Sequence, residues 1–462
     1  MRNKQKWFAI LLVLGLVLAA CGSSGGNETT TTAAGSEATT TTGAPAETTT
    51  TGEQAMDIAT DVGVDLEAGT INVGLLSDLS GPFAPLVQAI VAGHEAYWAS
   101  VNANGGINGL MVNVSDFTRD TAYVVDQHVQ MYEELKTQVV AFGHSTGSPH
   151  TMAINPQLQA DGILAIPLTW YSGWSDPAIN ANLLPHGTPY CIEAMNVIDF
   201  MKSENPDATT IALAGNPGDY GEDSLAGARM AAEALGLEVV LDDGGKINAT
   251  DEASLTEVAN DIANSGADLV WITTSPTPFG SIYGQALNAG FDGKWSGAAP
   301  SWSPALIAPD SAIKDALADD FYISQVYTPW GYDSPGNAFV RDTMAEFAPD
   351  AGPLDYYAEG FVEGEILHAA LSAAYDAGDM TQAGVLAAAK SLESVSFDGL
   401  APDEHYLGDP NDIVQRVQYI SRPDPAGLAG GTNTGSTMVA EAYTSPTAAA
   451  FEFNEACYKL QG

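Results

Sequence analysis

The stretch INVGLLSDLSGPFAPLVQAIVAGHEAYWASVNANGGINGLMVNV, residues 71–114, decides the fold. It opens on a run of aliphatic and β-branched residues that ends at Ser-Gly-Pro, a pattern typical of a buried strand followed by a turn. From residue 83 to residue 104 apolar side chains recur at helical spacing, and a second β-branched run follows a Gly-rich loop. The stretch therefore predicts a strand at 70–77, a helix at 83–104 and a strand at 110–116.

The alternation of strand and helix continues through most of the chain. Further strands are predicted at 138–142, 162–167, 209–214, 237–241, 268–273, 294–297 and 321–326, and further helices at 121–136, 148–160, 220–235, 251–265, 279–290, 334–347 and 354–377. Asp120 and Thr121 provide N-cap chemistry for the helix at 121–136. Such alternation favours parallel sheets with right-handed crossovers, and the length suits two cores better than one. The sequence predicts an α/β protein with two doubly wound sheets, followed by strand-like pieces at 413–421 and 437–444.

The amino terminus has the pattern of a secretory signal. Arg2, Lys4 and Lys6 precede an apolar run of 14 residues that ends in small residues before Cys21. The run is too short to span a bilayer comfortably, so residues 1–20 are predicted to be a signal peptide. The region resembles a bacterial lipobox, which implies cleavage before Cys21 and attachment of a diacylglycerol to its sulfur. An ordinary signal peptide with a chance cysteine is the alternative.

Residues 21–60 are rich in threonine and contain no aromatic residue. Such a segment cannot bury enough apolar surface to offset its chain entropy, and it is predicted to be a disordered tether. The chain as a whole has a net charge of −43, from 58 acidic and 15 basic residues. This charge argues against binding of nucleic acid or of anionic membranes by the folded part.

The sequence holds three cysteines, and lipidation of Cys21 leaves Cys191 and Cys457. An even pair in an exported protein suggests a disulfide, and two buried free thiols are the alternative. The seven histidines are scattered, with no H-x-x-x-H or C-x-x-C pattern, and no phosphate-binding P-loop occurs. No metal site and no cofactor are therefore predicted.

The segment VVAFGHSTGSPHTMAINP, residues 139–156, contains a G-x-S-x-G pattern between a strand and a helix. This is the context of a serine-hydrolase nucleophile elbow, and His368 or His405 follows Ser145 in the order that a triad requires. His368 lies inside an apolar helix pattern, however, and no HGGG-like oxyanion segment precedes the motif. A secreted esterase that uses Ser145 is therefore kept only as an alternative.

Several stretches together resemble the solute-binding proteins of branched-chain amino-acid ABC transporters, which have the type I periplasmic-binding-protein fold. Besides residues 71–114, these are DFTRDTAYVVDQHVQMYEELKTQVVAFGHSTGS, GDYGEDSLAGARMAAEALGLEVV and ADLVWITTSPTPFGSIYGQALNAGF. The resemblance covers residues 66–380 and implies two lobes joined by a three-strand hinge. The first lobe would comprise 66–190 with 328–400, and the second lobe 191–327 with 401–462.

The resemblance also implies a function without catalysis. The protein would be an extracytoplasmic, lipid-anchored component of an ABC importer, held at the outer face of the cell membrane through Cys21 alone. It would be a monomer, capture an amino-acid-like, amide or aromatic-acid ligand by hinge closure, and deliver it to permease and ATPase subunits. A ligand-sensing module that reports to a receptor is the alternative that the same fold permits.

In this fold the ligand lies in the cleft, at the carboxyl ends of strands from both sheets. Hydroxyls and free N–H groups at helix N-termini suit a carboxylate there. The positions that match the family's ligand-binding residues are Ser145, Thr146, Ser148, Thr169, Trp170, Tyr220, Thr274, Tyr356 and Phe83, with Ser275 and Tyr357 beside two of them.

One position departs from the family pattern. Amino-acid binders of the family hold the ligand ammonium with a second-lobe carboxylate that follows a short strand and a Gly-Pro pair. The matching stretch here is KWSGAAPSWSP, in which Ala299 takes the acidic position. Because a buried ammonium without a partner is costly, either Asp355, Glu222 or another acid substitutes, or the ligand is not an α-amino acid.

Overall fold

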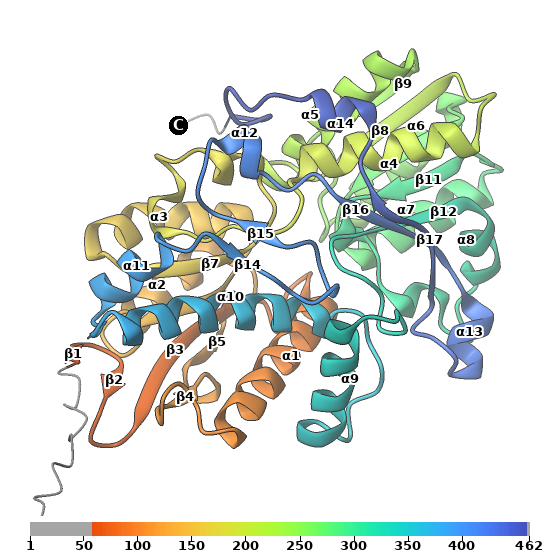
Figure 1. The fold of residues 1–462 in the computed structure, drawn as a ribbon. Helices are drawn as coiled ribbons and strands as arrows, with labels where there is room; N and C mark the ends of the chain where they lie inside the picture. The colour runs from red at the N-terminus through yellow and green to blue at the C-terminus, as the bar shows by residue number, and fades with distance from the viewer. Residues whose placement is uncertain (1–57, 460–462) are drawn as a thin grey trace, which may run out of the picture. The chain divides into compact units, whose positions relative to one another are not determined.

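Two β-sheets organise the part of the chain that the computed structural model describes, residues 58–459 (Figure 1). The first sheet is built on β3 (Thr70–Ser77), which pairs with β2 (Val64–Asp65) in antiparallel fashion. It pairs in parallel with β4 (Met111–Asn113), β5 (Thr118–Asp120) and β6 (Ala141–Thr146), and β6 pairs in parallel with β7 (Leu164–Leu168). Helices cover both faces of this sheet.

The side chains of the first sheet explain why both faces are covered. Val73 and Leu75 of β3 belong to one apolar cluster and Leu76 to another, and all three are fully buried. A strand that is buried on both sides reads as an almost continuous apolar run. The first cluster includes α1 (Ala84–Ala103) and α10 (Tyr357–Asp376), which pack together with α9 (Pro335–Phe347) and α11 (Gln382–Ala389); the second includes α2 (Val125–Leu135) and α3 (Ser148–Asp161).

The second sheet has seven strands in the order β17-β16-β12-β11-β10-β8-β9. Its parallel strands are β8 (Thr210–Gly215), β9 (Glu238–Asp243), β10 (Leu269–Thr273), β11 (Lys294–Gly297) and β12 (Phe321–Gln325), to which β16 (Gln418–Pro423) and β17 (Ser436–Tyr443) add an antiparallel edge. One face packs against α4 (Tyr190–Glu204) and α5 (Asp219–Leu235), the other against α6 (Glu252–Ser265) and α7 (Pro276–Asn288).

The described chain also contains shorter helices and strands. They are β1 (Ala59–Thr60), β13 (Asp379–Met380), β14 (Ser394–Val395), β15 (Glu404–His405), α8 (Lys314–Asp320), α12 (Pro410–Ile413), α13 (Pro425–Gly430) and α14 (Pro446–Ala450). Five 3-10 turns lie at Ser115–Phe117, Ser172–Ser175, Asn180–Asn182, Ala299–Ser301 and Pro304–Ile307.

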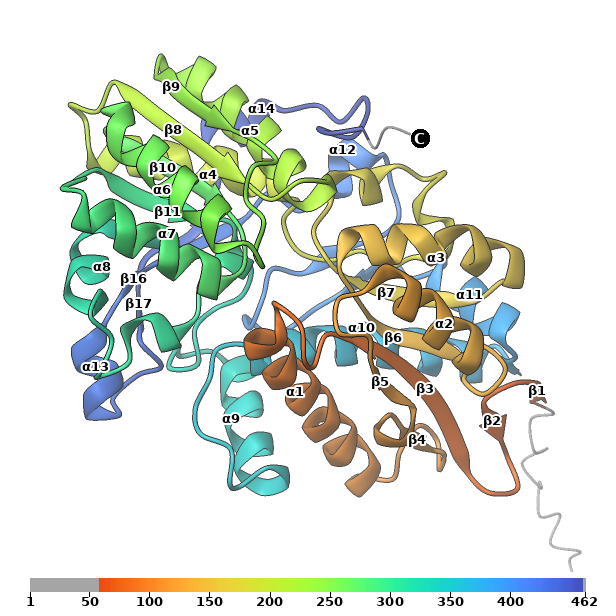
Figure 2. The same cartoon turned by 180° about the vertical axis from the view of Figure 1, so that it is seen from behind.

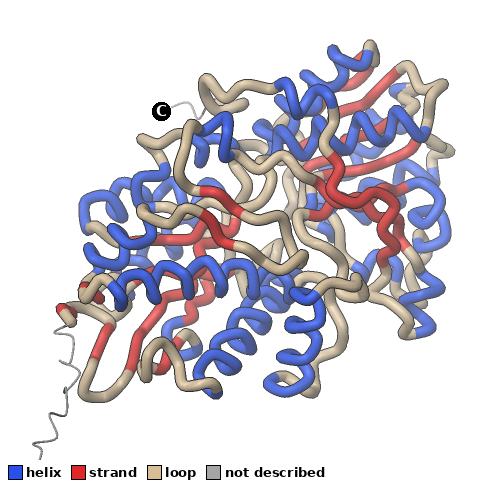
Figure 3. The backbone as a smooth tube through the Cα atoms, viewed as in Figure 1, coloured by secondary structure: helices blue, strands red, loops and turns tan. Residues whose placement is uncertain are grey.

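The chain passes between the sheets three times. It leaves β7 for α4, leaves β12 for α9, and leaves β15 for β16. We call the first sheet with α1–α3 and α9–α11 the first lobe, and the second sheet with α4–α8, α13 and α14 the second lobe. Figures 2 and 3 show the two groups of strands, each with its own helices. The predicted α/β class with two doubly wound lobes is confirmed.

Most predicted elements occur within a few residues of their predicted bounds, but the start of α2 was predicted wrongly. Ala122 and Tyr123 have positive φ angles of 48° and 55°, so the helix begins only at Val125. Asp120 does not cap it: its Oδ1 instead accepts the backbone N–H groups of Leu79 at 3.0 Å and of Ala122 at 2.9 Å. The chain thus makes a turn here, and this turn places Tyr123 beside the site described below.

A disulfide joins Cys191 in α4 to Cys457 near the end of the chain. The tail around it is tied down further, because the N–H of Cys457 donates to Ser172 Oγ at 2.8 Å and the N–H of Tyr458 donates to Asp223 Oδ1 at 3.2 Å. The predicted signal peptide, Cys21 and most of the predicted tether lie outside the described residues. Over residues 58–459, no helix combines the length and apolar character needed to cross a membrane.

Candidate functional site

A narrow cavity of about 50 Å³ lies between the two lobes. The first lobe contributes Phe83, Leu86, Val87, Ile90, Tyr123, Thr146, Gly147, Leu168, Trp170, Tyr356 and Glu359 to its walls; the second contributes Tyr190, Tyr220, Ala299 and Pro300; Val326 and Tyr327 come from the connection after β12. We call it the interlobe cavity. Its volume holds only a few water molecules, so a larger ligand requires the walls to move apart.

Five helices begin at the interlobe cavity. Phe83, Gly147 and Tyr356 are the N-cap residues of α1, α3 and α10, and Tyr190 and Tyr220 lie in the first turns of α4 and α5. The first N–H groups of a helix have no partner inside the helix and carry a partial positive charge. The cavity therefore favours an anionic or acceptor group such as a carboxylate.

Aromatic rings from both lobes meet around the cavity. Phe83 contacts Tyr123 with ring centroids 4.8 Å apart and Tyr220 at 5.8 Å. Tyr190 contacts Tyr220 at 4.9 Å and Trp170 at 5.9 Å. Such rings offer a large apolar surface with a polar group at one end, so the walls suit a ligand whose body is apolar.

The turn between β6 and α3 reaches the cavity through Gly147. Its φ angle is +96°, and a Cβ atom there would lie 2.7 Å from the ring of Tyr123. Glycine is therefore the residue that this turn requires. Thr146, one of the predicted ligand residues, lines the cavity, and its Oγ1 lies 2.6 Å from His144 Nε2.

The other predicted hydroxyl residues of the first lobe lie behind the cavity wall. Ser148 and Thr169 hydrogen-bond each other through their side chains. Ser145 is fully buried, with its Oγ 3.1 Å from His128 Nε2 and 2.8 Å from Thr151 Oγ1. None of these predicted residues lines the interlobe cavity in this structure.

Ser145 is also not in the geometry of a nucleophile elbow. It lies inside β6 and not at the turn that follows the strand, and its side chain is inaccessible. The Nδ1 of His128 has no hydrogen-bond partner within residues 58–459, so no acid completes a triad. His368, the alternative histidine, lies in α10 with its Nδ1 2.8 Å from the hydroxyl of Tyr97.

In the second lobe, Tyr220 lines the cavity and its hydroxyl donates to the carbonyl of Thr274 at 3.0 Å. Thr274 itself does not line the cavity. Its Oγ1 and the Oγ of Ser275 are buried and find no hydrogen-bond partner among the described residues.

Ala299 lines the cavity at the position where the family pattern places an acid. Its backbone N–H donates to Glu193 Oε1 at 2.7 Å, and Ser324 Oγ donates to the same oxygen at 2.6 Å. Burial raises the pKa of Glu193 to about 8, although both hydrogen bonds lower it. Glu193 therefore holds the loop at Ala299 through a hydrogen bond, and it does not line the cavity.

The two acids considered as substitutes are engaged elsewhere. Asp355 accepts hydrogen bonds from Thr434, Ser436 and the N–H of Trp330, and Glu222 pairs with Arg229 at 3.5 Å. Neither lines the interlobe cavity.

Glu359 is the only acidic side chain among the described residues that line the cavity. Burial raises its pKa, His186 lowers it by less, and Glu363 raises it again. Burial thus makes this carboxyl harder to ionise than an exposed one, and His186 is the neighbour that favours its charged form. His186 Nδ1 lies 3.3 Å from Glu359 Oε1. Burial lowers the pKa of His186, but Glu359 and Glu363 outweigh this effect and raise it to about 9.

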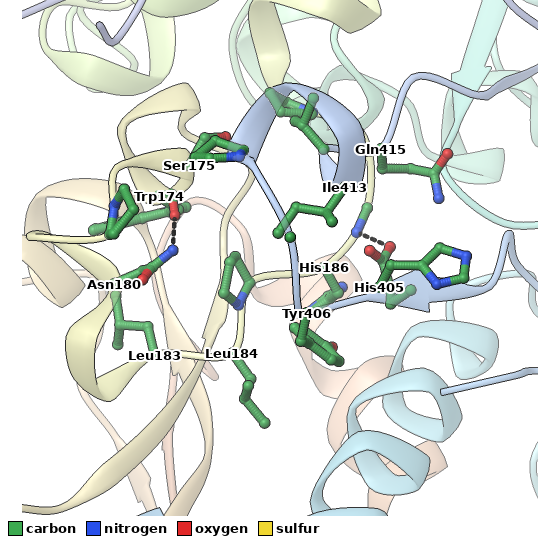
Figure 4. Close-up of a pocket in the computed structure, with 18 of the residues that line it drawn as sticks. Trp174, Ser175, Asn180, Leu183, Leu184, His186, His405, Tyr406, Ile413 and Gln415 are labelled. Atoms are coloured by element: carbon green, nitrogen blue, oxygen red, sulfur yellow. Dashed lines mark hydrogen bonds between the residues drawn. The ribbon is translucent and has the colours of Figure 1, made fainter. Parts of the chain in front are cut away.

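A second, wider cavity of about 310 Å³ lies beside the first (Figure 4). Its walls come from residues 170–189, the end of α11 and residues 404–415. Trp170 lines both cavities and so forms the partition between them, and His186 lines the second. We call this the side cavity.

The sequence did not point to several cavity residues. Leu86, Val87 and Ile90 of α1 have the spacing of ordinary core residues, and nothing in the pattern separates those that face a cavity from those that face a sheet. Tyr123 reaches the cavity through the turn before α2, which the sequence did not predict. Tyr190 begins α4, which was also unpredicted, although the preceding Pro189 is typical of a helix start.

A family model described as a periplasmic binding protein matches residues 70–423. Among solved structures, a fatty acid ABC transporter substrate-binding protein from Thermomonospora curvata is 26% identical with a TM-score of 0.76, covering 85% of this chain and 97% of that chain. A branched chain amino acid ABC transporter from Thermus thermophilus with bound valine is 18% identical with a TM-score of 0.68, covering 82% and 97%. A search of curated proteins gave no match.

Proposed function

Because the chain belongs to the periplasmic binding protein family, we propose that it is the solute-binding component of an ABC importer and captures a small carboxylic acid with an apolar body. Proteins of this family bind small ligands and are not enzymes, so no turnover at Ser145 is part of this function. The observation that carries the proposal is the interlobe cavity: aromatic and aliphatic walls from both lobes, ringed by helix N-termini.

The polar and apolar parts of the cavity correspond to the two parts of such a ligand. The N–H groups at the start of α3, whose first turn contains no acidic residue, and the hydroxyl of Thr146 are donors for a carboxylate. Leu86, Val87 and Ile90 offer an aliphatic surface for the body. The similarity to the Thermomonospora curvata protein, described as a fatty acid transporter component, supports the same class of ligand.

The cavity argues against an α-amino acid, including the branched-chain amino acids that the resemblance first suggested. Ala299 replaces the acid that would hold the ligand ammonium, and Asp355 and Glu222 do not face the cavity. Glu359 does face it, but its carboxyl is already paired with His186 at 3.3 Å, and burial raises its pKa. An ammonium would therefore be buried without a counter-ion, which costs several kcal/mol.

Capture would follow from closure of the two lobes about the three connections. An open form would admit the ligand, and a closed form would bury it between Phe83 and Leu86 of one lobe and Tyr220 of the other. This is the hinge closure known for binding proteins. The closed surface would then dock on the permease of a permease–ATPase transporter, with the lipid on Cys21 holding the protein at the outer face of the membrane.

The ligand that co-purifies with the protein tests this proposal. The purified chain is denatured and extracted, and the extract is analysed by mass spectrometry. We expect a monocarboxylic acid with an aliphatic or aromatic body, present at up to one equivalent and removed by dialysis after unfolding. Recovery of an α-amino acid would refute the proposed ligand class while leaving membership of the family intact.

A further inference from the structure

Three buried side-chain atoms that can act as metal ligands lie close together behind the interlobe cavity. None of them has a hydrogen-bond partner within the described chain. They are Nε2 of His186, Oε1 of Glu359 and Oε1 of Glu363. The side chains are 1%, 1% and 0% exposed, and one ligand atom from each lies within 4.8 Å of the others. We propose that His186, Glu359 and Glu363 bind a divalent first-row transition-metal ion, for which Zn²⁺ is the test ion.

The fold brings the three side chains together from two directions. Glu359 and Glu363 are four residues apart in α10, so they project from the same face of the helix one turn apart. His186 comes from the connection between β7 and α4. The next residue fixes this connection, because the N–H of Gly187 donates to Glu404 Oε1 at 2.7 Å. The helix supplies two carboxylates, and the connection places an imidazole opposite them.

The surroundings orient one of the carboxylates. His144 Nδ1 lies 2.8 Å from Oε2 of Glu363, the carboxylate oxygen that faces away from the cluster. This contact fixes the orientation of the carboxylate. The free oxygen, Oε1, lies 3.9 Å from His186 Nε2. Outer-shell contacts of this kind are a regular feature of metal sites and set the orientation of the ligands.

Distances and charge are both suited to a metal ion. Zinc bonds of about 2.0–2.2 Å place the ligand atoms of a tetrahedral site about 3.4 Å apart. The three ligand atoms lie within 4.8 Å of one another, so they need to approach by no more than about 1.4 Å. Binding of a dication would displace the proton from His186 and any proton from Glu359. Two carboxylates and a neutral imidazole would then balance its charge, as a buried charged cluster requires. One imidazole with two carboxylates favours Zn²⁺, Mn²⁺ or Fe²⁺ over Ca²⁺ and Mg²⁺, which prefer oxygen ligands alone.

The site has routes to solvent although its atoms are buried. His186 also lines the side cavity, and Figure 4 labels it among the residues of that cavity. Glu359 lines the interlobe cavity on the other side. An ion would therefore reach the cluster from one of these two cavities. This inference does not depend on the identity of the ligand in the interlobe cavity.

Equilibrium dialysis with Zn²⁺ tests the proposal. The purified protein is treated with a chelator and dialysed against Zn²⁺ in excess Mg²⁺, which occupies exposed carboxylates, and bound zinc is measured by mass spectrometry. Co²⁺ is then substituted as a spectroscopic probe of the coordination. Variants Glu359→Gln and Glu363→Gln remove one ligand each while keeping the side-chain volume. Glu193→Gln is the matched control, because it replaces a buried carboxylate outside the cluster.

We expect one Zn²⁺ per chain, a higher unfolding temperature with Zn²⁺ and visible Co²⁺ absorption. Both cluster variants should bind more than about a hundredfold more weakly, above the 10–100-fold typical of outer-shell changes, and the control should bind like the wild type. If Glu363→Gln fails to fold because the contact between His144 and the Glu363 carboxylate is lost, zinc binding by Glu359→Gln decides whether the proposal holds. An absence of stoichiometric zinc, or zinc binding unchanged in Glu359→Gln, would overturn the proposal.

Discussion

Phe83 of the first lobe lies edge-on against Tyr220 of the second lobe, with ring centroids 5.8 Å apart and ring planes at 80°. The two residues belong to different sheets and meet across the interlobe cavity. Their contact exists only while the lobes are together, so it couples the shape of the cavity to closure. Both lie where helices begin, which is also where a carboxylate is best stabilised.

Phe83→Ala should weaken ligand binding and favour the open form. The change removes an aromatic pair worth about 0.5–1.5 kcal/mol and apolar contact worth about 1.5–3 kcal/mol. We expect the Kd to rise by one to two orders of magnitude, measured by calorimetry with the co-purifying ligand, and the radius of gyration of the liganded protein to increase. Val439→Ala, at an exposed position of β17, is the control. An unchanged Kd for Phe83→Ala would show that this contact has no part in binding.

Replacement of Cys191 and Cys457 by serine should lower stability. The bond closes a loop of 266 residues, and in the chain-entropy model such a loop contributes at most about 5 kcal/mol. The tail from Ser445 to Tyr458 should also become more sensitive to proteolysis, because it is anchored beside Ser172 and Asp223. Thermal unfolding with and without reductant measures the first effect. A wild type whose unfolding temperature does not fall on reduction would contradict it.

Ser145→Ala should not alter hydrolytic activity, because we expect the wild-type protein to have no such activity. The hydroxyl is buried between His128 and Thr151. Its loss leaves His128 Nε2 unpaired at a cost of about 1–3 kcal/mol, whereas Thr151 keeps its bond to the carbonyl of residue 145. A fluorophosphonate probe should label neither wild type nor variant, while the unfolding temperature of the variant should fall. Labelling of the wild type that disappears in Ser145→Ala would restore the esterase interpretation.

The protein should be less stable at pH 8 than at pH 5. Burial raises the pKa of Glu193 to about 8 and that of Asp223 to about 7, above their values of 4.5 and 3.8 in an unfolded chain. A carboxyl whose pKa is higher in the folded state binds its proton more tightly there. Its contribution is complete below the unfolded pKa and is lost as the pH rises through the folded value.

Unfolding temperatures between pH 5 and pH 8 measure this trend, and Glu193→Gln is the matched variant. The amide keeps the acceptor for Ala299 and Ser324 but does not titrate, so the slope should be shallower than in the wild type. A wild-type stability that rises toward pH 8, or an identical slope in the variant, would contradict the assignment.

The strands and helices were predictable because each obeys a local rule. The run at Thr70–Ser77 is apolar throughout, as a strand covered on both faces must be, and β3 has these bounds. The start of α2 was not predictable in this way. Asp120 looks like a cap residue, but a contact with Leu79, distant in sequence, uses its side chain in another turn.

The site was predictable by region more than by residue. Phe83, Thr146, Trp170, Tyr220 and Tyr356 line the interlobe cavity, because they follow strands or begin helices at the edge where the lobes face each other. Whether a hydroxyl one or two residues away faces the cavity depends on side-chain packing, which a pattern of residue types does not encode. For the same reason, the cluster of His186 with Glu359 and Glu363 has no short sequence motif.

The most direct test of the proposed function compares an acid with its own α-amino derivative. Hexanoate and 2-aminohexanoate have the same carbon skeleton and differ only in the ammonium group. Calorimetric titration of the wild-type protein with each of them therefore measures the effect of that group on binding. Burial of an ammonium without a counter-ion costs several kcal/mol, so hexanoate should bind at least about a hundredfold more tightly. Tighter binding of the amino acid would contradict the account, because it would mean that a group in the cavity balances the ammonium.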